Sequence, residues 1–475
     1  MPEIHAEPYL HLAGLSHKSA LITWGAFYFK TKSRHADLEG RRRDSKAEWK
    51  LVDDSDLRHV HPPRRESIGA RSDPYGPARV NVYDMSGALV TTSFTETTNF
   101  CWVTGLEPNT SYRYEVIVKD EAWGDGERWD WTRGAEQGLA QRGGRYVNTF
   151  CTHPDPVAEP AGSFTFMVVG DFGTGIRKST PRRRQYEVSR AMQLAFEQHD
   201  VRMIITTGDN IYAGQRILGI PMGPTGADDD DWFFTYFQPY RYIVNRIPVY
   251  PSIGNHDTAE TEDRDDREQL LDNLYLRERI ASDEASGRAS LDPGLFYRFR
   301  YGRDVDFICI DTSKEDFFRG KRLYEYPKHW EWMNQTFVPD PDARWKCVFC
   351  HHPPFNAGPN HHNTDRMEQL LPLFSRAGVR VVLSGHEHNF QHSHNDGIDY
   401  FVTGAGSKVD PGTPRRFDEA KTVSWSSVAH FLLVTITGRT ITVRVIGELE
   451  TGALADVPRF TPAGEPISGP IVLRL

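Results

Sequence analysis

Short apolar runs rich in aromatic and β-branched residues recur along the first third of the chain. Gly, Pro and Asn turns separate them, a spacing typical of the strands of an all-β sandwich. The clearest runs are residues 20–24, 79–83, 100–103 and 112–116. Residues 30–77 interrupt this pattern with polar and charged positions, so we expect a long solvated loop there.

The pattern changes after a Pro-rich stretch at residues 152–162. A continuous apolar run at 164–169 is followed by apolar positions at helical spacing in 185–199 and by another apolar run that begins at Met203. This β-α-β alternation predicts a central β-sheet layered by helices. We therefore expect an all-β domain over residues 1–155 and an α/β domain over residues 156–475. Further buried strands are expected at 249–253, 305–310, 345–350, 379–383, 400–402, 431–436 and 441–445.

Composition narrows the classes of function. The chain's 475 residues include 56 Lys and Arg and 65 Asp and Glu, so its formal net charge is −9. No excess of basic residues is available to neutralise a nucleic-acid backbone, and we expect no nucleic-acid partner. No apolar run approaches the roughly 20 residues that a bilayer span requires, so we expect no membrane crossing. The first residues lack the basic and apolar regions of a secretory signal, which predicts a cytoplasmic chain, or an exported one whose leader was removed.

The five cysteines are expected to be reduced core residues. Their number is odd, and most of them lie in apolar, strand-like runs. Cys347 and Cys350 have the C-x-x-C spacing of some zinc sites, yet no second pair completes such a site and the neighbouring residues are apolar. We interpret this segment as a buried strand.

Residue types that bind metals follow five of the predicted strands. In open α/β sheets, groups placed just after successive strands converge beyond the carboxyl ends of those strands. A preceding glycine lets the backbone turn sharply and bring the next side chain inward. The set contains two carboxylates, a phenol, an amide oxygen and three imidazoles, which is too many donors for one ion and suits two. The segments are 170–173, 208–212, 254–257, 348–351 and 385–388.

These segments resemble the ligand motifs of the calcineurin-like metallophosphoesterases, and within them those of the purple acid phosphatases. The residues that match the superfamily are Asp171, Asp209, Asn255, His351, His386 and His388. Tyr212 is the narrower mark, because purple acid phosphatases use a tyrosine at this spacing as a phenolate ligand to ferric iron. The resemblance covers about residues 164–410 and implies an α/β fold, a layered β-sheet sandwich flanked by helices. Residues 106–112 also resemble the tyrosine corner of fibronectin type III domains, which implies such a sandwich for residues 1–155.

The resemblance also implies a binuclear metal centre. Fe(III) would be held by Asp171, Tyr212 and His388, and Asp209 would bridge to a second ion. That ion, a divalent Zn, Fe or Mn, would be held by Asn255, His351 and His386. A hard ferric ion suits carboxylate and phenolate ligands, whereas a divalent ion suits imidazole and amide oxygen.

Three further histidines are candidates for the substrate side of the site. His256 follows Asn255 directly, so we expect it to stabilise a phosphoryl group or to donate a proton. His361 and His362 resemble paired histidines that face the substrate in plant purple acid phosphatases, with one extra residue in the spacing, so either could face the site. We expect catalysis by His256, His361 and His362, and substrate binding by Asn255, His256 and His362. His352 is expected to point away, because alternate strand residues face opposite sides.

The expected function is hydrolysis of a small-molecule phosphate monoester, as in an acid phosphatase, by direct attack of a metal-bound hydroxide. The alternative is a phosphodiesterase or another specialised phosphoesterase that uses the same two-metal site. A binding protein with an inert second domain is disfavoured, because no ligand position is missing. The physiological substrate, the second metal and the oligomeric state remain open at this point.

Overall fold

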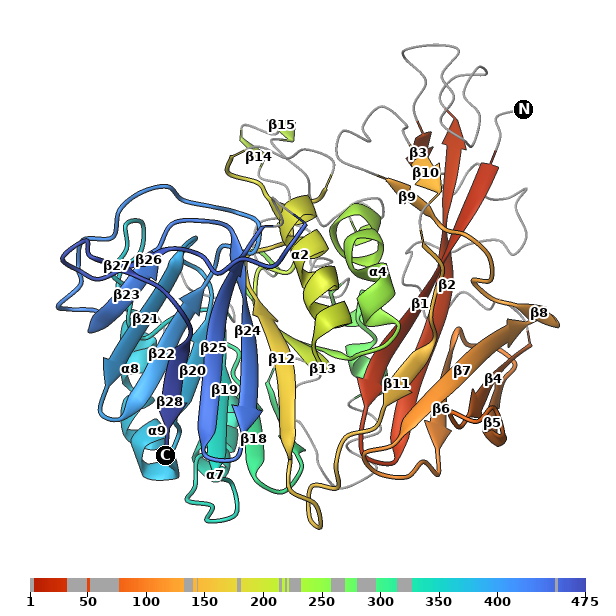
Figure 1. Cartoon of the computed structure of the whole chain (residues 1–475), viewed down its shortest axis with the longest axis horizontal. Coiled ribbons are helices and arrows are strands. Elements are labelled where there is room, and N and C mark those ends of the chain that lie inside the picture. The colour runs from red at the N-terminus through yellow and green to blue at the C-terminus, as the bar shows by residue number, and fades with distance from the viewer. Residues whose placement is uncertain are drawn as a thin grey trace.

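The computed structural model describes residues 4–31, 49–51, 77–131, 140–142, 144–176, 181–212, 216–217, 220–221, 232–257, 270–279, 296–313, 327–448 and 452–475. An all-β region lies beside a larger layered region that contains the helices (Figure 1). The loop expected at residues 30–77 lies almost entirely outside the described residues. No described helix has the length and apolar character needed to span a bilayer.

The described residues of the N-terminal region form strands joined by turns and loops, with no helix among them, which confirms the all-β prediction. One sheet has the order β1 (Ile4–Leu15), β2 (Ser19–Thr31) and β3 (Trp49–Leu51), with β6 (Phe100–Thr104) also paired to β2. A second has the order β11 (Thr149–Cys151), β7 (Ser111–Val118), β4 (Ala78–Tyr83) and β5 (Leu89–Thr95), and β8 (Glu121–Ala122) pairs with β7. A short third sheet joins β9 (Trp129–Trp131) to β10 (Ala140–Arg142).

The two larger N-terminal sheets share one apolar core. Buried positions alternate along β4 and β7, as expected for strands with one face turned to the core. Trp24, Val80 and Tyr114 belong to the same buried cluster. The hydroxyl of Tyr112 accepts a hydrogen bond of 2.9 Å from the backbone N–H of Glu107. This is the bond that a tyrosine corner makes, while the fibronectin type III assignment itself stays a prediction.

The larger region contains two extended sheets. The first has six strands in the order β16 (Val249–Ser252), β13 (Val201–Thr207), β12 (Ser163–Val169), β24 (His430–Thr437), β25 (Thr440–Gly447) and β28 (Ile471–Arg474). The second has nine, in the order β17 (Tyr297–Tyr301), β18 (Val305–Cys309), β19 (Trp345–Phe349), β20 (Val381–Ser384), β22 (Ile398–Thr403), β21 (Phe390–Asn395), β23 (Thr422–Ser426), β26 (Arg459–Phe460) and β27 (Pro466–Ile467). A two-stranded ribbon, β14 (Arg216–Ile217) with β15 (Ile220–Pro221), completes the described strands.

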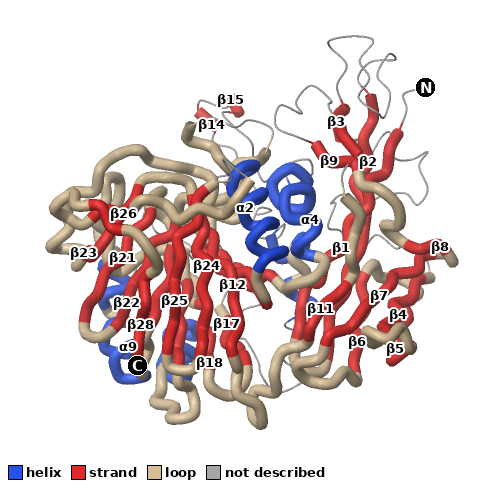
Figure 2. Tube along the Cα trace, viewed as in Figure 1, coloured by secondary structure: helices blue, strands red, loops and turns tan. Residues whose placement is uncertain are grey.

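Helices cover the outer faces of this two-sheet sandwich (Figure 2). They include α2 (Gln185–Gln198), the π-helix η2 (Phe233–Phe237), α4 (Gln238–Val244), α7 (Pro327–Thr336), α8 (Asp365–Glu368) and α9 (Leu371–Ala377). Along β12, Phe166 and Val168 belong to the core between the sheets, whereas Met167 and Val169 belong to the core beneath the helices. Because successive side chains of a strand point to opposite faces, alternate residues of β12 pack into different cores. This architecture confirms the predicted layered sandwich.

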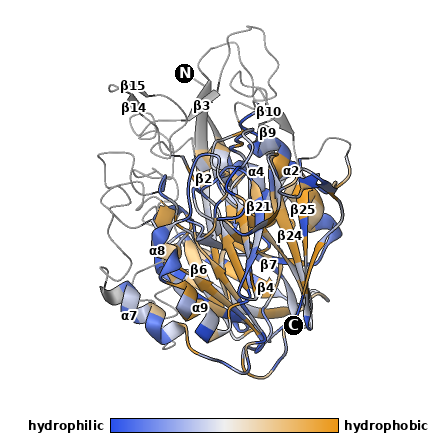
Figure 3. Cartoon of the chain, turned by 90° about the vertical axis from the view of Figure 1, so that its left-hand side faces the viewer, coloured by the Kyte–Doolittle hydropathy of each residue, from blue (hydrophilic) through white to orange (hydrophobic). Residues whose placement is uncertain are grey.

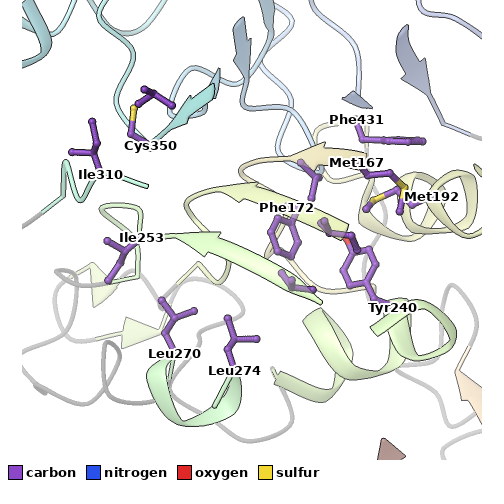
Figure 4. Packing of buried hydrophobic residues seen from close by; sticks show 14 of the residues in the cluster. Met167, Phe172, Met192, Tyr240, Ile253, Leu270, Leu274, Ile310, Cys350 and Phe431 are labelled. Atoms are coloured by element: carbon purple, nitrogen blue, oxygen red, sulfur yellow. The ribbon is translucent and has the colours of Figure 1, made fainter. Parts of the chain in front are cut away.

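Apolar side chains pack between the first sheet and the helices that cover it. Met167 of β12, Met192 of α2 and Phe431 of β24 pack together, with Phe172 and Tyr240 nearby (Figure 4). Apolar colour is strong along β24 and β25, and α8 and α9 show hydrophilic colour (Figure 3). All five cysteines are free, and Cys347 and Cys350 are fully buried, in agreement with their interpretation as core residues.

The π-helix η2 connects the N-terminal sheet to the larger region. Its Phe237 packs against Tyr9 with ring centroids 4.4 Å apart, and Tyr236 Oη lies 3.1 Å from His11 Nε2. On the other side, the buried Gln185 donates from Nε2 to the carbonyl of Thr235 at 2.6 Å. The same side chain accepts a 2.6 Å bond at Oε1 from the N–H of Gly175. η2 is therefore held between β1 and the loop that follows β12.

Candidate metal centre

The seven predicted metal ligands all lie shortly after parallel strands. β12, β13 and β16 run parallel in the first sheet, and β19 and β20 run parallel in the second. Because the carboxyl ends of all five strands meet at one edge of the sandwich, the residues that follow them converge. The order is Asp171 after β12, Asp209 and Tyr212 after β13, Asn255 after β16, His351 after β19, and His386 and His388 after β20.

Backbone strain marks three of these positions. Asp171, Asp209 and His386 have φ values of 53°, 49° and 71°, in the left-handed region that side chains rarely adopt. Strain of this kind costs about 1–3 kcal/mol per residue and gathers at functional sites. A Cβ at Gly208 would lie 2.5 Å from His351 Nδ1, and one at Gly385 would lie 2.5 Å from Asp171 Oδ2. These glycines are therefore required by close packing between neighbouring loops.

Asp171, Tyr212 and His388 form what we name the first group. The Tyr212 hydroxyl donates to Asp171 Oδ1 at 3.1 Å and lies 3.4 Å from His388 Nε2. His388 Nε2 is also 3.4 Å from Asp171 Oδ1. The three donor atoms converge on one point, as three ligands of a single ion would.

Asn255, His351 and His386 form the second group. Asn255 Oδ1 lies 2.9 Å from His351 Nε2 and 3.2 Å from His386 Nδ1. The two imidazole nitrogens are 3.3 Å apart. Unlike the first group, this one contains no anionic side chain.

Asp209 lies between the two groups. Its Oδ1 is 3.4 Å from His351 Nε2, and ligand atoms of Asp171, Asp209 and His351 all lie within 4.8 Å of one another. The backbone N–H of His386 donates to Asp171 Oδ2 at 2.9 Å, which ties the second group to the first. A carboxylate that bridges two ions would need the position that Asp209 has between the two groups.

The electrostatics of the centre suit bound cations. Burial, followed by the nearby Asp209 carboxylate, raises the pKa of Asp171 to about 7. Burial, followed by the Lys408 ammonium, lowers the pKa of His388 to about 3, so this imidazole stays unprotonated in mildly acidic solution. A cation would accept the nitrogen lone pairs and offset the negative charge that the two buried carboxylates concentrate. The donors present therefore fit a metal pair.

Asp257 braces two of the ligand loops. Its Oδ2 accepts bonds of 2.7 Å from the N–H of Gly254 and 2.9 Å from Asn210 Nδ2. Its Oδ1 accepts a 3.0 Å bond from the N–H of Ile211. The buried carboxylate thus joins the loop that carries Asp209 and Tyr212 to the loop that carries Asn255.

Glu387 is a supporting residue that the sequence analysis missed. It is fully buried, and its carboxylate accepts bonds from His361 N–H at 2.8 Å and from Asn356 Nδ2 and Asn360 N–H at 3.3 Å. It also lies 3.2 Å from His361 Nδ1. The available signal was its position between two ligand histidines in Gly-His-Glu-His.

The structure separates His361 from His362. The His361 ring lies 3.9 Å, centroid to centroid, from the ring of His386, and its side chain is 35% exposed. His362 is exposed at the surface. Of the two, His361 borders the centre.

His352 does not point away from the centre, so the expectation from strand alternation is wrong. β19 ends at Phe349, and the two-residue period does not extend beyond it. The buried His352 ring lies 4.3 Å from the His386 ring, and its Nδ1 is 3.0 Å from Thr312 Oγ1. It could join His351 and His386 around a metal ion.

His256 borders the first group. Its backbone N–H donates to Asp209 Oδ1 at 3.0 Å. Its ring lies 4.6 Å from the Tyr212 ring, and its side chain is 12% exposed. The imidazole is thus close to the predicted ligands and retains access to solvent.

Comparison with known proteins agrees with this geometry. Residues 164–390 match the family model of calcineurin-like phosphoesterases. Purple acid phosphatase 3 of Arabidopsis thaliana is 28% identical over 281 residues, which cover 53% of this chain and 65% of that protein. Tartrate-resistant acid phosphatase type 5 of Oryctolagus cuniculus is 25% identical over 270 residues, which cover 52% of this chain and 74% of that protein. The matched part is thus just under two thirds of the Arabidopsis protein.

Solved structures give the same fold. Purple acid phosphatase PPD1 from yellow lupin (Lupinus luteus) seeds has a TM-score of 0.55 at 12% identity, over 96% of this chain and 73% of that one. PhoD has a TM-score of 0.55 at 14% identity, over 97% of this chain and 91% of that one. At these identities the likeness establishes the calcineurin-like phosphoesterase fold and nothing finer.

Proposed function

We propose that this chain, whose residues 164–390 match the family model of calcineurin-like phosphoesterases, hydrolyses phosphate monoesters as an acid phosphatase. The observation that carries the proposal is the Tyr212 phenol, which converges with a carboxylate and an imidazole beside a second group of donors. Names of the Arabidopsis and rabbit relatives support the acid phosphatase assignment.

The first group would hold Fe(III) and the second a divalent Zn, Fe or Mn ion, with Asp209 between them. A phenolate and a carboxylate suit a hard ferric ion, and imidazoles with an amide oxygen suit a divalent ion. When bound, such a pair polarises the phosphoryl oxygens and lowers the pKa of a bound water.

His256 and His361 are the proposed acid–base and phosphoryl-binding groups. Asp209 fixes the backbone of His256 through the 3.0 Å bond, which sets where the imidazole can reach. Because a carboxylate only accepts hydrogen bonds, Glu387 receives the Nδ1–H of His361, and Nε2 is left for the oxygen of the leaving group. His362 has no such position, and we do not retain it among the substrate contacts.

An assay with an aryl phosphate monoester and the matching diester, from pH 4 to pH 8, tests the function. We expect the iron-supplemented protein to prefer the monoester, to have an acid optimum, and to absorb visible light through the Tyr212 phenolate. A preference for the diester would favour the phosphodiesterase alternative. Hydrolysis of neither ester by fully metal-loaded protein would contradict the proposal, and a colourless iron-loaded protein would contradict the role of Tyr212.

His361 and His362 form a matched pair for the leaving-group step. His361→Gln should lower kcat for the monoester by about 10²-fold or more, the usual contribution of a general acid. His362→Gln should leave kcat within about twofold, because the side chain is exposed. Equal effects of the two substitutions would show that the 3.9 Å approach of His361 to His386 has no part in the reaction.

A further inference from the structure

Lys408 lies beside the candidate metal centre, although no motif marks it. It belongs to the segment Ser407–Asp410, which follows β22. The backbone N–H of Lys408 donates to the carbonyl of Asp171 at 3.1 Å, and that of Asp410 donates to the carbonyl of His388 at 2.9 Å. The segment is therefore fixed to two of the predicted ligands, and the starting point of the Lys408 side chain is set by them.

The Lys408 side chain places its positive charge beside the first group. Lys408 Nζ lies 4.2 Å from the centroid of the Tyr212 ring, within the range of a cation–π contact. The residue is half-buried. The ammonium is thus an electrostatic part of the centre.

No described carboxylate lies within 4.0 Å of this ammonium to form an ion pair. A cation held next to a site that binds two metal ions faces like charge when the metals are present. An incoming anion would offset that repulsion. Lys408 also has a flexible four-carbon stem and three donor hydrogens, so it can follow a phosphate oxygen without moving its backbone.

The charge of the anion determines how strongly Lys408 attracts it. At a given distance the Coulomb energy scales with the product of the charges, so a dianion is attracted twice as strongly as a monoanion. A phosphate monoester is largely dianionic above pH 6, because its second pKa is about 6. A diester has one acidic oxygen fewer and stays monoanionic. Above pH 6, a lysine at this position therefore discriminates between the two ester classes.

We propose that Lys408 is a specificity-determining residue, whose ammonium binds a non-ester phosphate oxygen and favours monoesters over diesters. This inference rests on the proposed function, since it assumes that the phosphoryl group is bound at the two metal groups. His256 also borders the Tyr212 ring, so both side chains lie beside the first group.

The kinetic test compares Lys408→Met with Lys408→Arg at pH 7. For the methionine variant we expect kcat/KM on the aryl monoester to fall by at least about tenfold, as for loss of one hydrogen bond to a charged group, and that on the diester by about threefold or less. Lys408→Arg should recover most of the difference. Arg415→Met removes an exposed cation from the same loop and should change neither. Equal losses on both esters would overturn the proposal.

A binding measurement separates this inference from the proposed function. Calorimetry on the metal-loaded protein, with metal content checked, would compare inorganic phosphate with dimethyl phosphate, which is a monoanion. Lys408→Met should weaken phosphate binding by about tenfold and dimethyl phosphate binding by less. Unchanged affinity for phosphate would refute the role of Lys408. The expected binding pattern in a protein that hydrolyses neither ester would keep Lys408 as an anion contact and refute the proposed function instead.

Discussion

Asp209→Asn should remove nearly all turnover of the metal-loaded protein and leave its fold intact. Asparagine has nearly the same shape, tolerates the φ of 49° at this position, and keeps an oxygen that accepts the N–H of His256. What it loses is the negative charge between the two metal groups. Since metal-ion stabilisation of the transition state is worth several kcal/mol, we expect kcat for the monoester to fall by about 10³-fold or more.

The matched control for Asp209 is Asp120→Asn. Asp120 also has a left-handed backbone, with φ of 66°, and its side chain is 88% exposed. Turnover, metal content and thermal midpoint should be measured for both variants. Both should unfold within a few degrees of the original protein when metal-free. An Asp209→Asn protein that binds both metals and keeps its turnover would refute the bridging role.

Asp171→Asn should stabilise the metal-free protein, and the gain should grow as the pH rises from about 4 to about 7. Burial and the Asp209 carboxylate raise the pKa of Asp171 from 3.8 to about 7. Below pH 3.8 both the folded and the unfolded chain hold this proton, and no penalty arises. Between the two values the unfolded chain releases it first, so each unit of pH favours unfolding, and above pH 7 the penalty is complete.

Thermal unfolding in a chelator, from pH 4 to pH 8, measures this effect as the difference between variant and original protein. Asparagine preserves the local bonds, because its oxygen can accept the N–H of His386 and its amide can donate to the Tyr212 hydroxyl. A flat difference for Asp171→Asn, or one that shrinks with pH, would exclude a buried carboxyl that is hard to ionise. With metals present the order should reverse, since the original protein gains binding free energy that the variant lacks.

The convergence of the donors could be predicted from the sequence because parallel strands impose it. Asp171 and Asp209 follow β12 and β13, which are hydrogen-bonded neighbours in parallel register, so residues just past their ends must lie together. The apolar run and the Gly-Asp that follows it can both be identified from neighbouring residues in the sequence. Together they predict a buried strand that ends in a ligand. The continuous apolar run at residues 164–169 likewise predicted a strand in a central sheet layered by helices, and β12 is buried on both faces.

Positions in irregular segments could not be predicted in the same way. His352 follows the end of β19, where no periodicity defines the direction of a side chain, and its orientation depends on Thr312 from another loop. The choice between His361 and His362 depends on the bonds of Glu387, a contact across 26 residues. Lys408 reaches Tyr212 only because two loops meet in space. Each of these arises from tertiary contact, which a one-dimensional pattern does not record.

The packing of η2 joins the N-terminal sheet to the part of the chain that matches the family model. The family match begins at residue 164, yet Tyr9 and His11 of β1 contact one side of η2, and Gln185 connects its other side to Gly175. Residues 164–390 transplanted into another protein would carry every predicted ligand but would leave the aromatic face of η2 without its covering. Because η2 is also tied to the loop that carries Asp171, the N-terminal sheet supports the candidate metal centre indirectly. A chimeric protein would therefore have to keep β1, β2 and η2 together.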